Sequence, residues 1–328
     1  MNTFANSQRL MSAIANPQHL LRSLLASIRK ELVTSMTKDL CGAEATMCRN
    51  RIHRLFDYTM GEGKFARSSL ALRTYLALNS SPSDEQFDSA VRVSLTIEML
   101  QTFYIIEDDI MDGGKWRRGK PCWYKLPGVG LTAINDGLLL DCGIDTVIRQ
   151  TIPNHPKIHA ILRDFSEAKQ KTVIGQMLDT DTTELDTFSW SRYASIVEHK
   201  TSHYSFFLPL VAQDDFLDCF GDPAITGKSN LTDLAERKCT WITCALVDKL
   251  SKTAPEKLAI FRENFGGKSE QQLKLARQIV LEEQIAQQFE HYQNKMIGEI
   301  RSELAKFPAE PIRNILSQTL DDIVNRQK

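Results

Sequence analysis

Apolar residues recur every three or four positions along much of the chain, which is the spacing of one face of an α-helix. Between Arg92 and Asp112 this spacing is kept by Val93, Ile97, Leu100, Tyr104 and Ile105. The same pattern runs from Trp190 to Phe207 and from Leu273 to Ile300. Turn-forming residues separate these stretches, and hairpin dipeptides between alternating runs are missing. The pattern predicts an all-α fold.

The composition agrees with this prediction and excludes some partners. The 328 residues include only 16 glycines and 11 prolines, so the residues that interrupt helices are scarce. Lysine and arginine (40) nearly balance aspartate and glutamate (41), so no overall field favours a nucleic acid partner. No stretch approaches the roughly 18 consecutive apolar residues of a membrane span. We expect no nucleic acid partner and no membrane span.

The chain shows no internal linker, so we expect one all-α domain over residues 31–328. Residues 1–30 carry four basic residues and no acidic one. That composition is typical of a mitochondrial transit peptide and also of a frayed basic helix start, and both interpretations stay open. The seven cysteines form no CxxC pair, which fits reduced thiols in a reducing compartment. We expect a cytoplasmic protein, with a mitochondrial one as the alternative.

The pattern Asp-Asp-x-x-Asp occurs twice, at Asp108–Asp112 and at Asp214–Asp218. On a helix, positions i and i+4 lie on one face about 6 Å apart, so each motif presents two carboxylates in one direction. A glycine follows each motif, which places both at the end of a helix. Carboxylates there lie in the negative field of the helix dipole and favour a cation. Few oxygen ligands with room for water suit Mg²⁺ that also binds phosphate.

Basic residues near these motifs are candidate phosphate ligands. They are Lys115, Arg117, Arg118 and Lys120 after the first motif, Lys64 and Arg67 beside Gly63, and Lys228 after Gly227. Each cluster alone is an ordinary feature of a protein surface. Together with the paired aspartates they predict a site for two diphosphates.

At this point the sequence resembles a known family. The segments Phe103–Asp112, Arg117–Lys125, Pro127–Asp136, Gly175–Asp179, His199–Pro209, Asp214–Pro223 and Lys238–Trp241 are similar to eukaryotic farnesyl diphosphate synthase, a trans-prenyltransferase. The resemblance runs from about residue 50 to 245. It implies an isoprenoid synthase helical bundle around a central cavity, and a homodimer.

The resemblance also implies roles for individual residues. Three Mg²⁺ ions per site would be held mainly by Asp108, Asp112 and Asp214. The allylic diphosphate would contact Arg117, Lys200, Lys228 and Lys238. Isopentenyl diphosphate would contact Lys64, Arg67, Gln101 and Arg118, and Gln176 would also contact substrate. Lys200 and Thr201 would stabilise the allylic cation, as the catalytic residues.

The implied reaction is Mg²⁺-dependent, head-to-tail condensation of isopentenyl diphosphate with dimethylallyl or geranyl diphosphate. Phe103 and Tyr104 lie about one helical turn before Asp108, where a growing tail would point. Bulk at that depth predicts a C10 to C15 product. Plain core residues are the alternative interpretation of both aromatics.

The sequence departs from the family between Pro209 and Asp214. About thirty residues, one helical hairpin, are missing there, and Val211 stands where the family has a glutamine. Without them, the spacing from Lys200 to Asp218 predicts one helix bent at Pro209, which carries Asp214 roughly 21 Å from Lys200. The segment Ser229–Asp233 is one residue longer than usual, which makes the roles of Asp233 and Lys238 less secure.

Four functions stay open on these grounds. A working short-chain prenyltransferase keeps the charged motifs. A catalytically impaired isoform follows from the missing hairpin. A regulatory partner that dimerises with an intact synthase is the third, and a class I terpene cyclase is a weaker fourth.

Overall fold

A computed structural model of the chain describes residues 16–204, 208–222 and 231–324. Its contacts divide the chain into two compact units, where the sequence led us to expect one domain. Of the described residues, the first comprises 16–115, 121–163 and 308–316, and the second comprises 116–120, 164–204, 208–222, 231–307 and 317–324. No described helix is long and apolar enough to cross a membrane.

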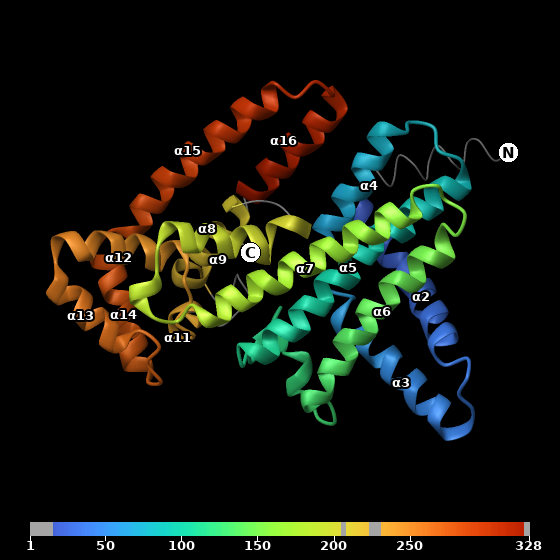
Figure 1. Ribbon diagram of the computed structural model, residues 1–328, viewed down its shortest axis with the longest axis horizontal. Coiled ribbons are helices and arrows are strands. Elements are labelled where there is room, and N and C mark those ends of the chain that lie inside the picture. Colours follow the sequence, from blue (N-terminus) through green and yellow to red (C-terminus); the bar gives the residue numbers. More distant parts are fainter. Residues whose placement is uncertain (1–15, 205–207, 223–230, 325–328) are drawn as a thin grey trace. The chain divides into compact units, whose positions relative to one another are not determined.

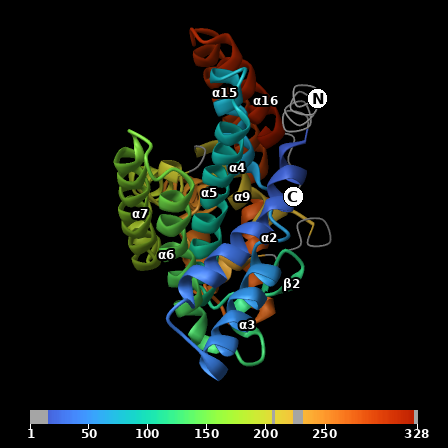
Figure 2. The same cartoon turned by 90° about the vertical axis from the view of Figure 1, so that its right-hand side faces the viewer.

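The first unit is built mainly from five helices of the described chain (Figure 1). They are α2 (Pro17–Met36), α3 (Gly42–Thr59), α4 (Ala66–Leu78), α5 (Asp84–Met111) and α6 (Ala133–Thr151). Two short 3₁₀ helices, η1 (Trp123–Lys125) and η2 (Gly130–Thr132), lie between α5 and α6 in sequence. Helix α5 packs against both α6 and α4 (Figure 2), and therefore forms the centre of the unit.

Helix α5 has clear start and stop signals. Ser83 and Gln86 form a capping box at its first turn, where Asp84 and Glu85 also favour the positive end of the dipole. The helix ends in a Schellman motif: Gly113 N–H donates to the Ile110 carbonyl and Gly114 N–H to the Asp109 carbonyl. Gly113 has φ of 67°, which glycine adopts without strain. The first Asp motif thus occupies the last helical turn, as predicted.

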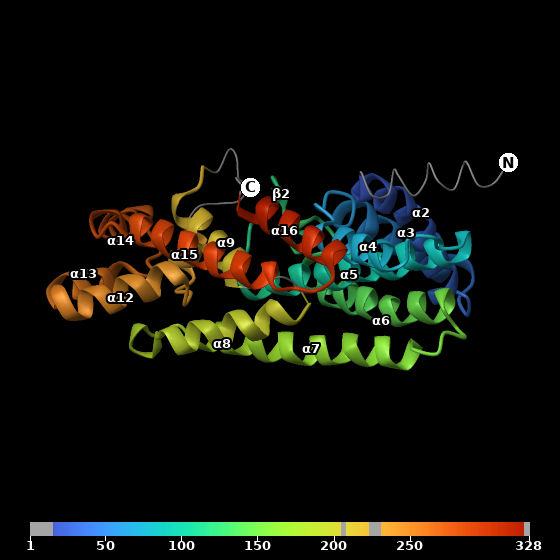
Figure 3. The ribbon, with the colours of Figure 1, turned by 90° about the horizontal axis from the view of Figure 1, so that it is seen from above.

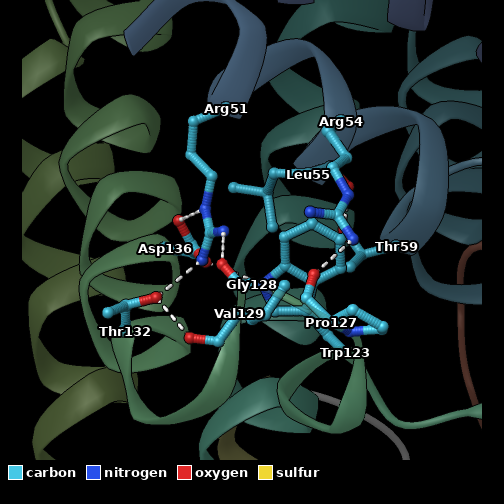
Figure 4. A network of polar contacts seen from close by, with 10 residues as sticks. All are labelled: Arg51, Arg54, Leu55, Thr59, Trp123, Pro127, Gly128, Val129, Thr132 and Asp136. Carbon is cyan, nitrogen blue, oxygen red and sulfur yellow. Dashed lines mark hydrogen bonds and ion pairs between the residues drawn. The ribbon is translucent and has the colours of Figure 1, made fainter. Parts of the chain in front are cut away.

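A polar network fastens the segment after α5 to α3 (Figure 4). The guanidinium of Arg51 binds both carboxylate oxygens of buried Asp136, and Trp123 Nε1–H donates to Asp136 Oδ2 at 2.7 Å. The guanidinium groups of Arg51 and Arg54 also lie 5.2 and 5.5 Å from the centre of the Trp123 ring. Arg51 donates further to the Gly128 carbonyl. Since each polar group has a partner, the buried carboxylate is compensated.

The second unit contains the remaining elements. Its 3₁₀ helices are η3 (Leu185–Thr187) and η4 (Ser202–Tyr204). Its helices are α8 (Trp190–Lys200), α9 (Leu208–Phe220), α11 (Thr232–Ala235), α12 (Trp241–Thr253), α13 (Pro255–Asn264), α14 (Glu270–Glu282) and α15 (Ile285–Ala305). Helices α7 (Ile158–Asp181) and α16 (Glu310–Val324) contribute residues to both units. Figure 3 shows α8 alongside α7.

Aromatic side chains dominate the core of the second unit. The ring of Phe216 on α9 stacks on that of Phe289 on α15 at 4.6 Å, and Trp241 meets Phe289 edge-on at 5.2 Å. Trp241 and Phe289 are almost completely buried. Such contacts add about 0.5–1.5 kcal/mol to the burial of the rings themselves. They hold the end of α9 against α12 and α15.

Two of the predicted helices are interrupted. Within residues 190–207, helix α8 ends at Lys200, and α9 begins only at Leu208. The prediction of one helix bent at Pro209 is therefore wrong. Pro209 instead lies in the first turn of α9, where its missing N–H costs nothing. The pattern over residues 273–300 breaks at Gln284, which adopts a φ of 55° between α14 and α15.

The basic N-terminal segment divides at Asn16. From Pro17 onward it forms α2, and Leu21 and Ile28 are completely buried in the first unit. This part therefore belongs to the core and is not frayed. Residues 1–15 lie outside the described residues.

Candidate active site

The first Asp motif separates into half-buried and buried carboxylates. Asp108 and Asp112 are half-buried, whereas Asp109 is only 3% exposed. Asp112 caps the end of α5, and its N–H donates to the Asp108 carbonyl. The two predicted metal ligands thus lie at the negative end of a 28-residue helix.

The neighbouring face of α5 packs against α6. A side chain at Gly137 of α6 would collide with Glu107 Oε1 and crowd the Phe103 ring, so these groups fill the space left by the glycine. Burial raises the pKa of Glu107 to about 7. The rings of Phe103 and Tyr104 lie 4.8 Å apart, which puts both aromatics together one turn before the motif.

The predicted isopentenyl diphosphate residues of the first unit lie around the start of α4. Lys64 is exposed and Arg67 half-buried, and between them Phe65 is buried at a φ of 51°. Arg22 holds this turn, since Nη2 donates to the Gly63 carbonyl at 2.8 Å and its guanidinium lies over the Phe65 ring. A left-handed residue other than glycine stores strain, which is common at functional sites.

Gln101 lies on the same helix, α5, as the first Asp motif. Its Oε1 atom is buried and has no hydrogen-bond partner among the described residues. One turn earlier, Glu98 Oε1 accepts from Ser68 N–H and Oγ–H, which ties α5 to the first turn of α4. An unpaired buried acceptor near the Lys64 turn fits a polar ligand.

Arg117 and Arg118 lie on a short hairpin that the sequence did not predict. Strands β1 (Trp116–Arg117) and β2 (Lys120–Pro121) are joined by Arg118 and Gly119, whose φ angles of 56° and 75° are typical of a type I′ turn. The hairpin is closed by the bond from Cys122 N–H to the Lys115 carbonyl, and Tyr58 O–H donates to the Pro121 carbonyl at 2.7 Å. Arg118 is exposed and Arg117 half-buried.

The second Asp motif lies at the end of α9, as predicted. Its last aspartate, Asp218, is bound by groups of α11. Asp218 accepts at both carboxylate oxygens, from Thr232 N–H and Oγ–H and from Asp233 N–H. It therefore caps the first turn of α11, and that it faces the same way as Asp214 to bind a cation stays a prediction. Burial, with a contribution from Asp218, raises the pKa of Asp233.

Asp215 is the buried member of the second motif. Its Oδ2 accepts from Tyr193 O–H at 2.9 Å and from the Trp241 backbone N–H at 2.8 Å. Burial raises the pKa of Asp215 to about 7, although the two hydrogen bonds lower it. The nearby carboxylates of Asp214 and Asp179 also raise this pKa. The second motif thus lies close to the carboxylate of Asp179.

Asp179 on α7 brings together two of the predicted substrate ligands. Its Oδ2 lies 2.6 Å from Lys200 Nζ and 2.9 Å from Lys238 Nζ. Burial alone would raise the pKa of this carboxyl, but the two ammonium groups outweigh it and lower the pKa. Two ammonium groups thus meet at one buried carboxylate, which places two candidate diphosphate ligands side by side.

Close helix packing places Lys200 there. A side chain at Gly175 would collide with the Lys200 backbone nitrogen and with the carbonyl carbon of His199, so only glycine lets α7 and α8 approach this closely (Figure 3). Thr201 follows as the C-cap of α8. Gln176 is half-buried and lies three residues before Asp179.

Lys238 is fixed by the turn before α12. Its N–H donates to the Asp233 carbonyl, and the preceding Arg237, at a φ of 59°, donates from Nε to the Thr183 carbonyl at 3.0 Å. The extra residue after Lys228 therefore does not displace Lys238 from the cluster. Lys228 itself lies outside the described residues.

The described carboxylates suit a metal ion that shares its ligands with substrate and water. Within the described part of the chain, no group of three His, Cys, Asp or Glu side chains gathers closely enough to hold one. Mg²⁺ usually takes only one or two protein carboxylates and completes its shell with water and substrate phosphates. Half-buried carboxylates at helix ends, such as Asp108 and Asp112, fit that mode of binding.

Sequence reasoning missed the two buried acceptors of the second unit. In the sequence, Asp179 stands out only as part of the segment Gly175–Asp179, and Asp215 only as the second residue of an Asp motif. The spacing of Asp179 from Lys200 and Lys238, 21 and 59 residues, gives no local signal of a contact. Two adjacent aspartates, Asp214 and Asp215, in an otherwise apolar helix are the local indication that the sequence offers.

Asn in place of Asp179 should destabilise the protein above about pH 4. The pKa of Asp179 is lower in the folded chain than its ordinary value of 3.8, so its stabilising effect is present above that value and lost as pH falls through the folded pKa. At pH 7 we expect a loss of about 3 kcal/mol, because two lysines lose their partner. Urea denaturation between pH 3 and 7 measures this difference. Asp181→Asn, an exposed change on the same helix, should have little effect, and an equal loss at all pH values would contradict the assignment.

Comparisons with known proteins agree with the motifs. The family model described as polyprenyl synthetase matches residues 49–212 and 211–282. Farnesyl pyrophosphate synthase of Schizosaccharomyces pombe is 33% identical, over 75% of this chain and 80% of the relative. The Gallus gallus enzyme of the same name is 31% identical, over 91% and 90%. The Zea mays enzyme is 30% identical, over 94% and 97%.

Solved structures agree on the fold. Farnesyl diphosphate synthase of T. brucei complexed with minodronate superposes with a TM-score of 0.86 and 23% identity, over 95% of this chain and all of that one. The same enzyme complexed with risedronate gives 0.85 and 24%. The all-α isoprenoid synthase fold is thereby confirmed, and so is the resemblance found in the motifs. The chain belongs to the polyprenyl synthetase family of prenyltransferases.

Proposed function

We propose that this protein condenses isopentenyl diphosphate head-to-tail with dimethylallyl or geranyl diphosphate, to give geranyl or farnesyl diphosphate. The observation that carries the proposal is the trio of Asp179, Lys200 and Lys238 beside the second Asp motif. It supplies concentrated positive charge next to carboxylates, in a family whose similar members are named farnesyl pyrophosphate synthases. The comparisons favour chain elongation over an impaired isoform, a regulatory partner or a cyclase.

The reaction needs charge stabilisation more than a protein nucleophile. The allylic C–O bond breaks with its electron pair on the departing diphosphate, and the double bond of isopentenyl diphosphate attacks the resulting cation. Transfer of a proton from the condensed cation to the released diphosphate completes the product. Lys200, Lys238 and Arg117 balance the charge of the departing diphosphate. The backbone carbonyls of Lys200 and Thr201, or the Thr201 hydroxyl, stabilise the cation.

Asp108, Asp112 and Asp214 would hold Mg²⁺, three ions per site by family resemblance. When bound, the metal acts as a Lewis acid toward diphosphate oxygens. Lys64, Arg67, Gln101 and Arg118 would bind isopentenyl diphosphate. The strained turn at Phe65 and the unpaired Gln101 Oε1 support a ligand there. Gln176 and Lys228 complete the proposed substrate contacts.

We also propose that this chain lacks a helical hairpin of the family between Pro209 and Asp214. Two observations support it. The family model matches in two segments that meet at residues 211–212. The alignment with the Zea mays relative is 342 positions long, although this chain has 328 residues, so some positions have no counterpart here. Helix α9 still begins at Leu208 and ends at the motif.

The protein acts as a homodimer in our proposal. Leu131 on η2 and Ile134 and Leu138 on α6 are 68%, 41% and 49% exposed, and the spacing of four residues puts Ile134 and Leu138 on one side of α6. An exposed apolar row of this kind is a common subunit contact. Sedimentation velocity tests this, and a monomer at assay concentrations would contradict it.

The seven free cysteines support a reducing compartment, the cytoplasm, with the mitochondrion as the alternative.

Activity tests the main proposal. Purified protein with Mg²⁺, geranyl diphosphate and radiolabelled isopentenyl diphosphate should give labelled farnesyl diphosphate. Asp108→Ala should lower kcat by about 10²–10³, because the charge of the departing diphosphate loses support. Asp145→Asn, at a half-buried position of α6 where Asp145 pairs with Arg149 of the same helix, is the control. If neither the natural chain nor a chain with the hairpin restored gives labelled product, the proposed enzymatic activity is refuted.

Product length tests the role of the aromatic pair. Replacing Phe103 by Ala and Tyr104 by Ser should lengthen the product beyond C15, because the bulk that would stop the tail is removed. Chromatography of dephosphorylated products measures the chain length. A less active enzyme with unchanged products would show that the two rings are ordinary core residues.

A further inference from the structure

The two Asp motifs share a pattern of burial. In each, the first and last aspartates are half-buried, and the second is buried: Asp109 is 3% and Asp215 is 9% exposed. A ligand of a substrate-bound metal must be reachable from the substrate cavity. The second position of each motif therefore differs in kind from the first.

Asp215 has two donors from different helices. The Tyr193 hydroxyl comes from α8 and the Trp241 N–H from the first turn of α12, and both bond to Oδ2. Tyr193 and Trp241 are 3% and 4% exposed, so these hydrogen bonds are shielded from water. In such surroundings an unmatched donor or acceptor is costly, and the three groups hold one another in place.

Other polar groups of α9 also bond to neighbouring helices. Gln213 accepts from Gln293 of α15, and Asp218 caps α11. The Cys219 carbonyl accepts from Arg277 of α14 at 3.1 Å. These bonds fix the rotation of α9 about its axis. Asp214 precedes Asp215 by one residue, a 1.5 Å rise and about 100° of rotation, so fixing Asp215 fixes the direction of Asp214.

We infer that Asp215 is a positioning residue: through Tyr193 and the N-terminus of α12 it aims Asp214 at the metal-bound diphosphate, and is not itself a metal ligand. The inference rests on the proposed function. Residues that orient metal ligands typically affect metal affinity by 10- to 100-fold when replaced. Asp215 therefore matters to ligand binding although its carboxylate never meets the ligand.

Binding of inorganic diphosphate in the presence of Mg²⁺, measured by isothermal titration calorimetry well below the Tm, tests this. Tyr193→Phe and Asp215→Ala should each weaken binding about tenfold. Asp215→Asn should weaken it less than threefold, because an amide oxygen in the place of Oδ2 still accepts from both Trp241 N–H and the Tyr193 hydroxyl. Tyr292→Phe is the matched control, since Tyr292 contacts the Trp241 ring in the same aromatic cluster.

A second step separates positioning from general destabilisation. In the background of Asp214→Ala, Tyr193→Phe should cause no further loss of diphosphate affinity, because the group that it positions is gone. A lowered Tm with unchanged affinity in Tyr193→Phe would overturn the inference. So would additive losses in the double variant.

The competing role gives the opposite pattern. If Asp215 bound metal directly, Asp215→Asn would be as harmful as Asp215→Ala, and Tyr193→Phe would resemble Tyr292→Phe. Diphosphate binding does not require turnover. A chain that binds diphosphate but forms no prenyl product thus refutes the proposed function and leaves this test intact, whereas a natural chain that binds no diphosphate overturns the inference.

Discussion

The second unit depends on one buried carboxylate, Asp179, held between Lys200 and Lys238. Burying a charge costs several kcal/mol unless it is paired, so Asp179 requires its lysines. The lysines in turn come from the end of α8 and from the turn before α12, and the pair of contacts therefore ties three chain segments together. The requirement that stabilises the fold also concentrates positive charge, which a diphosphate needs. The ammonium groups of Lys200 and Lys238 thus stabilise the fold and are also the groups that we propose to bind diphosphate.

Neighbouring carboxylates could not all play this role. Asp179, Asp214, Asp215, Asp218 and Asp233 lie close enough that several raise one another's pKa. Most of this repulsion is relieved by specific donors. Asp215 uses a hydroxyl and a backbone N–H, and Asp218 uses the first residues of α11. Acidic residues that are adjacent in sequence thus differ in role. Those that accept hydrogen bonds from other helices stabilise the packing, and the others are candidate metal ligands.

The sequence predicted much of the fold because its signals are local. The Ser83 capping box, the glycines after both Asp motifs and the helical spacing of α5 act within a few residues. Failures arose where backbone conformation overrode periodicity. Gln284 and Arg118 adopt positive φ, which apolar spacing does not reveal, so one predicted helix became two and a hairpin was missed. Asp179 was missed for another reason: its lysines lie 21 and 59 residues away, and only the packing at Gly175 brings α8 to it.

The shortening that we propose before the second motif changes what must hold that motif. A helix of 13 residues spans only about 20 Å, so packing along α9 contributes less than it does in a long helical hairpin. Four of its last eight residues, Gln213, Asp215, Asp218 and Cys219, instead bond to α15, α8 and α12, α11, and α14. Directional hydrogen bonds thus replace helix length as the constraint. Because these bonds are few and the two at Asp215 are shielded from water, losing one of those two should disturb Asp214 more than losing an apolar contact of equal area.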